Sequence, residues 1–250
     1  MSFRVSLGGD VIHYLGAVGF FRALDESNIL NNVEIHCSGF SCIPAIVYLT
    51  KPQSSYNILS NAWAEAQKVF KNAALTSLDE LSKNILLLYK MSTVINKESS
   101  KKRIQEFVEK FVPSCEIAES DNVKVHAFDV STNKDVILYG NSKDLLLKAL
   151  PYPLDFAPVE NFISSSWVFG ISEGDGIIYL DWIERNTPKR ATDYLLLATF
   201  ARTSALVNEK LQRARFPYRI RLSNSKDDFR IISLKFYQIG QELAGAIKNV

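Results

Sequence analysis

The chain has 250 residues, of which 47% are hydrophobic and 22% are charged, a composition that supports one sizeable buried core. Its 29 basic and 27 acidic side chains leave a formal net charge of +2, which gives no reason to expect nucleic acid as a partner. The three cysteines stand at no metal-ligand spacing and fit a reducing compartment better than a disulfide framework.

The first ten residues lack the basic, apolar and cleavage regions of a secretory signal. No apolar run reaches the roughly 18 residues that a membrane-spanning helix needs. The chain also contains no dinucleotide or phosphate-binding glycine loop and no metal-ligand cluster. We therefore expect a soluble cytoplasmic protein that uses neither a metal nor a cofactor.

Two strand, turn and helix units open the chain. Residues 3–7 form a β-prone run that ends at Gly8-Gly9, and an amphipathic stripe over 14–24 predicts the helix that follows. Residues 33–37 predict a second strand, and after the turn that ends at Ser41 an apolar stretch over 43–49 is long enough for a buried helix. The repeated unit is typical of a three-layer α/β/α fold with a mostly parallel central sheet.

Amphipathic spacing next predicts three helices, near residues 56–70, 78–88 and 104–111. We interpret the block from about 51 to 113 as a helical cap or insertion that follows the second helix. No internal repeat, low-complexity tract or linker divides the chain, so a single domain over 1–250 is expected.

Strand character returns in the second half of the chain. Residues 123–130 and 136–139 predict two strands around a turn, and a helix over 143–150 leads into a proline-rich loop at 151–158. The runs Tyr194 to Phe200 and Tyr218 to Leu222 predict two further buried strands. A closing helix is expected over 236–247.

Ser41 is the candidate nucleophile. It stands between a predicted strand and a predicted helix, where a sharp turn projects a hydroxyl group onto a helix N-terminus. The motif is an incomplete G-x-S-x-G, because Ile43 replaces its second glycine. On the motif alone, a serine that caps the helix is at least as good an interpretation. The Gly8-Gly9 turn could bring backbone N–H groups to an oxyanion, or it could be a plain tight turn.

A serine nucleophile needs a base, and the three histidines are poor candidates for it. His36 and His126 lie inside predicted strands, where a structural role is the commoner case, and His13 precedes Ser41 in the first turn of a helix. The chain order Ser, Asp, His of the α/β-hydrolases cannot be built from these positions. A carboxylate that acts directly on the serine is the remaining route.

Two late aspartates are candidates for that carboxylate. Asp175 lies in the turn Gly174-Asp175-Gly176 between apolar segments, as expected of an acid that faces a site at a strand end. An exposed turn residue is, however, the commoner fate of an Asp-Gly pair. Asp181, in the sequence Tyr-Leu-Asp-Trp, is the rival.

Taken together, these segments resemble the patatin-like phospholipase family over nearly the whole chain. The runs SLGGDVIHYLGAVGFFRALDESNI and VEIHCSGFSCIPAIVYL look like that family's glycine-rich loop with its first helix, and its nucleophile strand, turn and helix. The run VKVHAFDVSTNKDVILYG is similar to a family segment with an Asp-x-x-Thr turn, and ALPYPLDFAPVE to the loop before the catalytic aspartate. The resemblance implies a patatin-like fold.

The resemblance also favours Asp175 over Asp181. In the family, a strand that begins near an alanine-aspartate pair follows the catalytic Asp-Gly motif, and Ala191-Thr192-Asp193 look like the start of that strand. Asp175 lies eighteen residues before Asp193, the family spacing. Ser41 would then attack the acyl carbon and Asp175 would take its proton.

The activity that the resemblance implies is hydrolysis of carboxyl esters of phospholipids or other acyl lipids. Backbone N–H groups of Gly8, Gly9 and Asp10 would hold the oxyanion, and His13 would occupy the place of a basic residue that assists that loop. Acyl lipid is therefore the expected partner, and transient contact with a membrane surface is compatible with it.

Two groups of residues have both a lipid-related and an ordinary interpretation. Aromatic and apolar side chains of the cap could line an acyl tunnel, but core packing is their commoner role: Tyr56, Trp63, Phe70 and the run Ile85 to Leu88. The basic segment Arg213 to Arg221 could contact anionic head groups, although a solvated strand edge is the commoner setting for such residues.

Departures from the family pattern support an alternative function. Asp10 and Val11 replace further expected glycines, Ile43 replaces the second glycine of the turn, and Ile177 stands where glycine or alanine is usual. A patatin-like scaffold that has lost turnover and serves as a lipid-binding or regulatory protein would explain them. A nucleotide-binding α/β domain is disfavoured because the phosphate motifs are absent.

Overall fold

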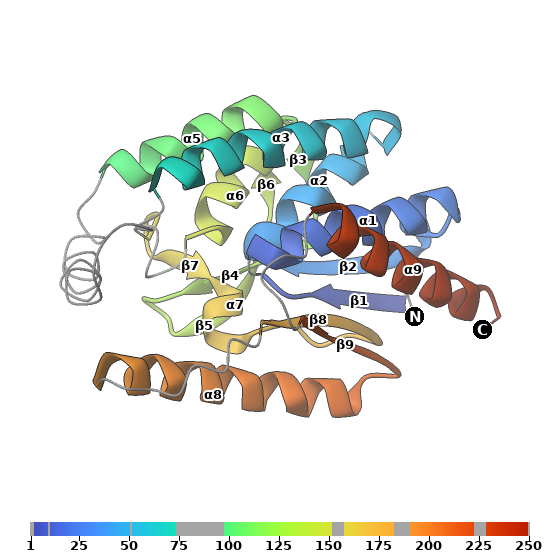
Figure 1. Cartoon of the computed structure of the whole chain (residues 1–250). Coiled ribbons are helices and arrows are strands. Elements are labelled where there is room, and N and C mark those ends of the chain that lie inside the picture. The colour runs from blue at the N-terminus through green and yellow to red at the C-terminus, as the bar shows by residue number, and fades with distance from the viewer. Residues whose placement is uncertain are drawn as a thin grey trace.

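The structure, a computed structural model, describes residues 3–9, 11–50, 52–73, 98–151, 158–182, 191–222 and 229–249. Its centre is a mixed, mostly parallel sheet of seven strands in the order β5-β4-β2-β1-β8-β9, with β7 paired to β4 off this path (Figure 1). The strands that run parallel are β1 (Phe3–Leu7), β2 (Val33–Ser38), β4 (Val123–Asp129), β8 (Gly176–Trp182) and β9 (Phe216–Leu222). The strands β5 (Lys134–Leu138) and β7 (Phe162–Ser164) pair antiparallel with β4.

Helices lie on both faces of the sheet, which confirms the predicted α/β fold class. The larger core lies between one face and the helices α1 (Val11–Glu26), α2 (Cys42–Thr50) and α9 (Phe229–Lys248) (Figure 1). Side chains alternate along each strand, so Val5 and Leu7 of β1 join this core while Ser6, equally buried, points to the other face. Burial of both faces is the usual condition of a parallel sheet.

An outer layer of helices covers α1 and α2. It comprises α3 (Pro52–Ala73) and α5 (Glu98–Phe111), with α6 (Ser142–Ala149) beneath α5 (Figure 1). The buried hydroxyl of Tyr14 on α1 donates a hydrogen bond of 2.7 Å to the carbonyl of Leu59 on α3, and burial raises the pKa of Tyr14. The helix predicted over 78–88 and most of the proline-rich loop lie outside the described residues.

The opposite face is covered by the long helix α8 (Ala191–Arg213) and the short helix α7 (Ser165–Phe169), and a second apolar cluster there joins Ile177 of β8 to Val207 of α8. The prediction of a strand over Tyr194 to Phe200 was therefore wrong, because this segment belongs to α8. A seven-residue apolar run does not by itself distinguish a strand from a buried helix. Tyr194 and Ala198, one helical turn apart, are both exposed and lie on the solvent side of α8.

A small two-stranded sheet and two single-turn helices complete the chain. The strands β3 (Glu116–Ile117) and β6 (Gly140–Asn141) pair antiparallel, and single turns of 3₁₀ helix, η1 (Leu30–Asn32) and η2 (Gly39–Ser41), precede and follow β2. The predicted turn between β4 and β5 is confirmed: the Asp129 carboxylate accepts hydrogen bonds from the hydroxyls of Ser131 and Thr132, at 2.6 and 2.9 Å.

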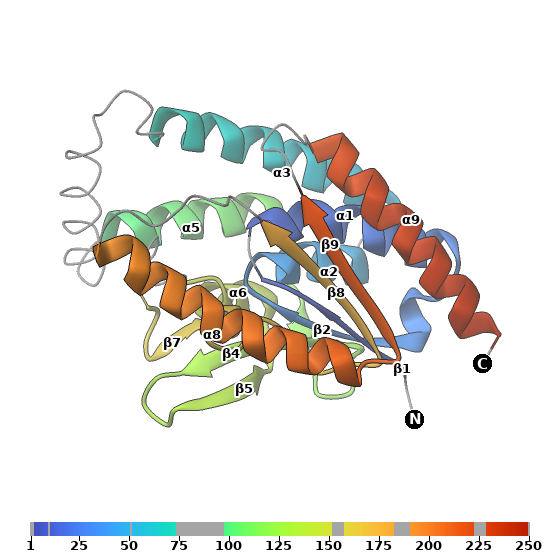
Figure 2. The same ribbon diagram turned by 60° about the horizontal axis from the view of Figure 1, so that its bottom comes forward.

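Helices α1 and α9 cross at close range because glycines line their contact (Figure 2). A Cβ atom on Gly19 would lie 1.8 Å from the carbonyl oxygen of Ser233, and one on Gly240 would lie 2.7 Å from the Cβ of Ala23. A helix normally loses stability when it contains glycine. Here the glycines are retained because backbone, which cannot move aside, occupies the space of a side chain.

Replacement of Gly19 by alanine should therefore destabilise the protein, by about 1–3 kcal/mol or more, because the new methyl group overpacks the contact between α1 and α9. Gly245 is the matched control, a helical glycine of α9 at which a Cβ atom would meet no other atom within 4 Å. Gly245→Ala should be neutral or stabilising, by up to about 1 kcal/mol. Urea unfolding of the two variants measures the difference, and equal stability would contradict the close helix contact.

Candidate active site

The candidate site lies at the edge of the sheet where the parallel strands β1, β2 and β8 have their carboxyl ends. The turn Gly8-Gly9 follows β1 there, and the turn that contains Ser41 follows β2. In open α/β sheets this edge is where ligands bind, because the loops after neighbouring strands meet there.

The turn after β2, Gly39–Ser41, is in direct contact with the turn after β1, Gly8-Gly9. The backbone N–H of Phe40 donates a 2.8 Å hydrogen bond to the carbonyl of Gly9. Gly39 has a φ of 56°, in the left-handed region, and a Cβ atom on it would lie 2.4 Å from the same Gly9 oxygen. Glycine is thus needed at position 39 both for its backbone angle and for space.

Two serines that the sequence analysis missed complete this contact. Strand β4 pairs with β2 as far as His126 and with β7 from Ala127 onward, so β7 continues on the side of β4 where β2 stops. The buried hydroxyls of Ser164 and Ser166, at the end of β7 and in the first turn of α7, lie 2.8 Å apart. A Cβ atom on Gly9 would lie 2.0 Å from the Ser166 hydroxyl. The run of serines over 164–166 is visible in the sequence, but the strand pairing that brings it here is not.

Ser41 is the last residue before α2, at the N-terminal end of that helix. Its side chain is fully buried, and its hydroxyl donates a 3.0 Å hydrogen bond to the carbonyl of Ser38. The sharp backbone turn falls at Gly39, and Ser41 is not among the described residues with positive φ. The predicted strand, turn and helix around Ser41 are confirmed, with the hydroxyl group held inside the turn.

The structure does not bring Asp175 to Ser41, which corrects the predicted pairing of these two residues. Asp175 directly precedes β8, and Gly176 lies beside Val5 in the first half of β1. Val5 in turn lies beside Ile35 of β2, and Ser38 follows three residues after Ile35. Asp175 and Ser38 are therefore four residues apart along the direction of the strands, which corresponds to about 13 Å. The two candidate residues lie at opposite ends of the parallel strands, Asp175 at the amino end and Ser41 at the carboxyl end.

Asp175 has a structural role where it lies. Its Oδ2 atom accepts a 2.9 Å hydrogen bond from the backbone N–H of Arg4, and its carbonyl accepts one of 2.8 Å from Phe216. It therefore ties together the starts of β1, β8 and β9. The family spacing that favoured Asp175 also fails, because Asp193 lies near the start of α8 and not at the start of a strand.

Asp181, the rival acid, lies at the other end of β8. The backbone of Asp181 pairs with Arg221 of β9, one residue before β8 ends. Its neighbour Leu180 donates a backbone hydrogen bond of 2.9 Å to Nε2 of His13. Asp181 is thus on the same edge of the sheet as Ser41, and only β1, which stops at Leu7, lies between β8 and β2.

The three predicted oxyanion residues have different settings. The N–H of Gly8 is directed at the carbonyl of Ile178, at 3.4 Å, as part of the sheet, which leaves it a poor oxyanion donor. Gly9 lies at the meeting point of the turns, and Asp10 lies outside the described residues.

His13 does not supply the positive charge that its sequence position suggested. Its ring is fully buried, and because Nε2 accepts the N–H of Leu180, that nitrogen carries no proton and the ring is neutral. A Cβ atom on Gly8 would lie 2.3 Å from the His13 ring. Close approach of this ring therefore explains why glycine stands at position 8.

The aromatic residues of the outer helices pack as ordinary core residues where they are described. The ring of Trp63 stacks on Tyr14 at 6.0 Å, and the guanidinium of Arg22 lies over the ring of Tyr56 at 5.1 Å. The side chain of Phe70 and the run 85–88 lie outside the described residues.

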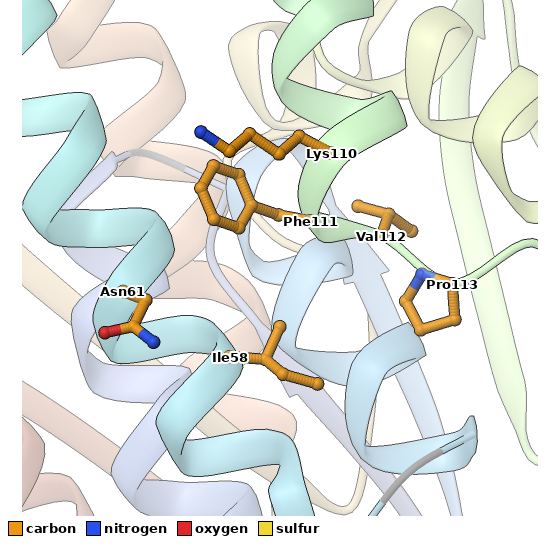
Figure 3. Close-up of a pocket in the computed structure, with 6 residues that line it drawn as sticks. All are labelled: Ile58, Asn61, Lys110, Phe111, Val112 and Pro113. Carbon is orange, nitrogen blue, oxygen red and sulfur yellow. The ribbon is translucent and has the colours of Figure 1, made fainter.

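A hollow of about 280 Å³ lies in the same outer layer and not at the edge of the sheet that carries Ser41. Figure 3 shows Ile58 and Asn61 of α3 on one side and Phe111 at the end of α5 on the other.

The basic segment over 213–221 contributes β9, which is an edge strand of the sheet. Arg213 pairs with Glu209 one turn earlier in α8, at 2.5 Å, and Arg219 contacts the side-chain oxygen of Asn208. Partners within the protein therefore account for these two arginines. No helix of the described ranges is long and apolar enough to cross a membrane. Within those ranges, no three His, Cys, Asp or Glu side chains are grouped as metal ligands.

The fold is similar to the crystal structure of VipD from Legionella pneumophila. The match has a TM-score of 0.47 and 11% sequence identity, and it covers 98% of this chain and 67% of that one. No protein-family model and no curated protein sequence matches the chain. Because a shared fold does not determine chemistry, a function must be argued from the residues of the site.

Replacement of Gly39 by alanine tests the close contact between the turns after β1 and β2. The variant should lose well over 1 kcal/mol of stability, because a left-handed φ and a collision with the Gly9 carbonyl act together. Asn133→Ala is the matched control, since it places alanine at the same φ of 56° in an exposed turn. Denaturant unfolding should show a much smaller loss for the control, and comparable losses would mean that only the backbone angle matters.

Proposed function

We propose that this chain is a serine acyl hydrolase of the patatin-like class, which cleaves carboxyl esters of phospholipids or other acyl lipids with Ser41 as its nucleophile. The observation that supports this most is the place of Ser41, between a central parallel strand and the N-terminus of a buried helix. It lies at the carboxyl ends of the strands, where open α/β sheets bind their ligands. The lipid class of substrate is supported by the sequence resemblance.

In the proposed reaction, the Ser41 hydroxyl must first leave the carbonyl of Ser38. Rotation of its side chain would free the oxygen for attack on the acyl carbon, and a carboxylate would take its proton. The partial positive charge at the N-terminus of α2 would favour the alkoxide and the oxyanion that follow. Full burial of Ser41 means that the substrate must displace part of the surrounding turn.

We propose Asp181 as the carboxylate that serves Ser41. It belongs to the strand end that faces the same edge of the sheet, whereas Asp175 is held at the opposite edge by the backbone of Arg4. Strand β8 is two strand spacings from β2, about 10 Å, and the two-glycine turn after β1 occupies the space between their ends.

A second candidate function is a patatin-like scaffold that binds lipid without turnover. It is favoured by the same hydrogen bond and burial at Ser41, and by Ile43, which is fully buried where the family has glycine. In this alternative the serine hydroxyl has a structural role, because the hydrogen bond that it donates to the carbonyl of Ser38 holds together the turn before α2.

A fluorophosphonate probe, which reacts with activated serines, separates the two functions. The parent protein should be labelled and Ser41→Ala should not, with ester hydrolysis reduced by about a thousandfold or more. Ser55→Ala is the matched control, because Ser55 is also fully buried and also donates a 3.0 Å hydrogen bond to a backbone carbonyl, that of Val47. Equal labelling of parent and Ser41→Ala would exclude Ser41 as the nucleophile, and no labelling of either would support the scaffold.

The two aspartates give opposite expectations. Asp181→Asn should slow labelling and hydrolysis by about a hundredfold to ten-thousandfold, the usual contribution of a general base. Asp175→Ala should leave the labelling rate unchanged and lower the free energy of unfolding by about 1 kcal/mol, because it removes one hydrogen bond to Arg4. Labelling kinetics and urea unfolding of both variants measure this, and slow labelling of Asp175→Ala alone would restore the pairing of Asp175 with Ser41.

A further inference from the structure

A row of hydrogen-bonded titratable side chains crosses the sheet face that is opposite the large core. On β2, Glu34 and His36 alternate with core residues, and on β4 His126 does the same. The contacts run without a gap: 2.6 Å from Glu34 Oε1 to His36 Nε2, 2.8 Å from His36 Nδ1 to His126 Nε2, and 2.9 Å from His126 Nδ1 to Asp135 Oδ2. We call these four residues the histidine row.

The number of protons in the histidine row follows from these contacts. An ionised carboxylate only accepts hydrogen bonds, so the ring nitrogens that face Glu34 and Asp135 must both carry protons. Two neutral imidazoles then have no proton left for the contact between them, and two lone pairs would face each other at 2.8 Å. A third proton on the pair removes this repulsion and makes one ring an imidazolium. A fourth would set two N–H groups and two positive charges against each other.

His36 is the less favourable position for the charge. Burial lowers the pKa of His36, and although the hydrogen bond to Glu34 opposes this, the charge of His126 acts in the same direction as burial. His36 is then a neutral ring that donates to Glu34 and accepts from His126, while the His126 imidazolium donates to both His36 and Asp135. Every polar atom between the two carboxylates has a partner in this arrangement.

Other charged groups face the histidine row from several elements. Arg4 of β1 pairs with Glu34 at 3.4 Å, Lys124 of β4 also acts on Glu34, and Lys210 of α8 interacts with Asp135. Burial raises the pKa of Tyr139, and the negative charges of Glu119 and Glu34 raise it further. The three cations oppose the uptake of a proton, whereas the carboxylates of Glu34 and Asp135 and the direct contact between the two rings favour it.

The histidine row is connected to the candidate active site through Ser165. The Ser165 hydroxyl donates a 2.6 Å hydrogen bond to Oδ1 of Asp135, the carboxylate that holds His126 by its other oxygen. Ser165 is the first residue of α7, and its neighbours Ser164 and Ser166 fill the space beside Gly39 and Gly9. These contacts form a continuous connection from Asp135 to the turns that hold Ser41.

We propose that the histidine row holds one proton more than two neutral imidazoles carry, and that in this state Asp135 positions the first turn of α7 against Gly9, next to the turn that carries Ser41. Asp135 is a positioning residue in this proposal, since it acts through Ser165. Loss of the shared proton as pH rises, or gain of another as pH falls, would release the row and loosen the turn. The proton count is independent of the proposed hydrolase function, and only the effect on Ser41 depends on it.

Nitrogen-15 NMR of histidine side chains tests the proton count directly, because the chain has three histidines. At pH 7.5, one unit above the ordinary histidine pKa of about 6.5, independent rings would be about nine-tenths neutral. We expect one ring with both nitrogens protonated and a second protonated at Nε2 only, with His13 protonated at Nδ1 as an internal reference. His36→Gln should return the remaining ring of the pair to ordinary titration. Two neutral rings at pH 7.5 would overturn the proposal.

The positioning step is read from the backbone amide signals of residues 164–166. They should shift at the same pH as the ring signals in the parent protein and lose this pH dependence in Asp135→Asn. Asp129→Asn is the matched control, because Asp129 also accepts a serine hydroxyl at 2.6 Å but lies outside the row. Amide signals that do not follow the rings, or that behave alike in both variants, would show that the row does not position α7.

The labelling rate of Ser41 by a fluorophosphonate then separates this proposal from the proposed function. The rate should have a bell-shaped pH profile whose limits match the ring titration, and Asp135→Asn should flatten that profile while Asp129→Asn retains it. If the parent protein is not labelled at any pH but the amide signals follow the rings, Ser41 is not a nucleophile and the positioning row is still supported. A labelling profile unchanged in Asp135→Asn would overturn the link to Ser41.

Discussion

The close approach of three turns at the carboxyl edge of the sheet is the constraint on which the candidate site depends. The carbonyl of Gly9 accepts the N–H of Phe40 and lies where a side chain on Gly39 would be, while Ser166 fills the space beside Gly9. Because Gly9 and Gly39 have no side chains, the backbones of the two turns are in direct contact, and this contact fixes the position of the start of α2. Ser41 owes its position to this contact more than to its own motif.

The same contact gives Ser41 two opposing properties. It lies at a helix N-terminus, where an anion is stabilised, yet it is buried and its hydroxyl is satisfied by the carbonyl of Ser38. A resting serine with an internal partner costs the protein nothing, whereas a reactive one must exchange that partner for a base. Only the hydrolase requires this exchange of partners, whereas the lipid-binding scaffold does not. In the hydrolase, Asp181, which lies at the same end of the strands as Ser41, would be the base.

The sequence predicted those parts of the fold whose signals are local. The first strand, the two helices after the glycine turns, the hairpin around Asp129 and the closing helix were all found from periodicity and turn residues. The run from Tyr194 was misjudged, because an apolar run of seven residues is compatible with either state. Asp175 was assigned to a strand end correctly but to the wrong edge of the sheet, since spacing along the chain does not say at which end of β8 a residue lies. Pairings between distant segments, such as β4 with β7, leave no local signal at all.

The histidine row shows why a buried sheet face can be polar without a loss of order. Each ring nitrogen of the two histidines has a partner, so burial of the rings does not leave an unsatisfied group of the kind that destabilises a core. Its geometry also depends on register, because a slip of one residue between β2 and β4 would turn His36 and His126 apart, one of them toward the apolar core. A slip of two residues would keep every side chain on its own face, so the apolar face, lined by valine, isoleucine, cysteine and alanine, would discriminate against it only by shape, whereas the histidine row would lose its contacts. The polar row therefore adds specificity that apolar packing lacks, and it does so at the strands that carry the turn of Ser41.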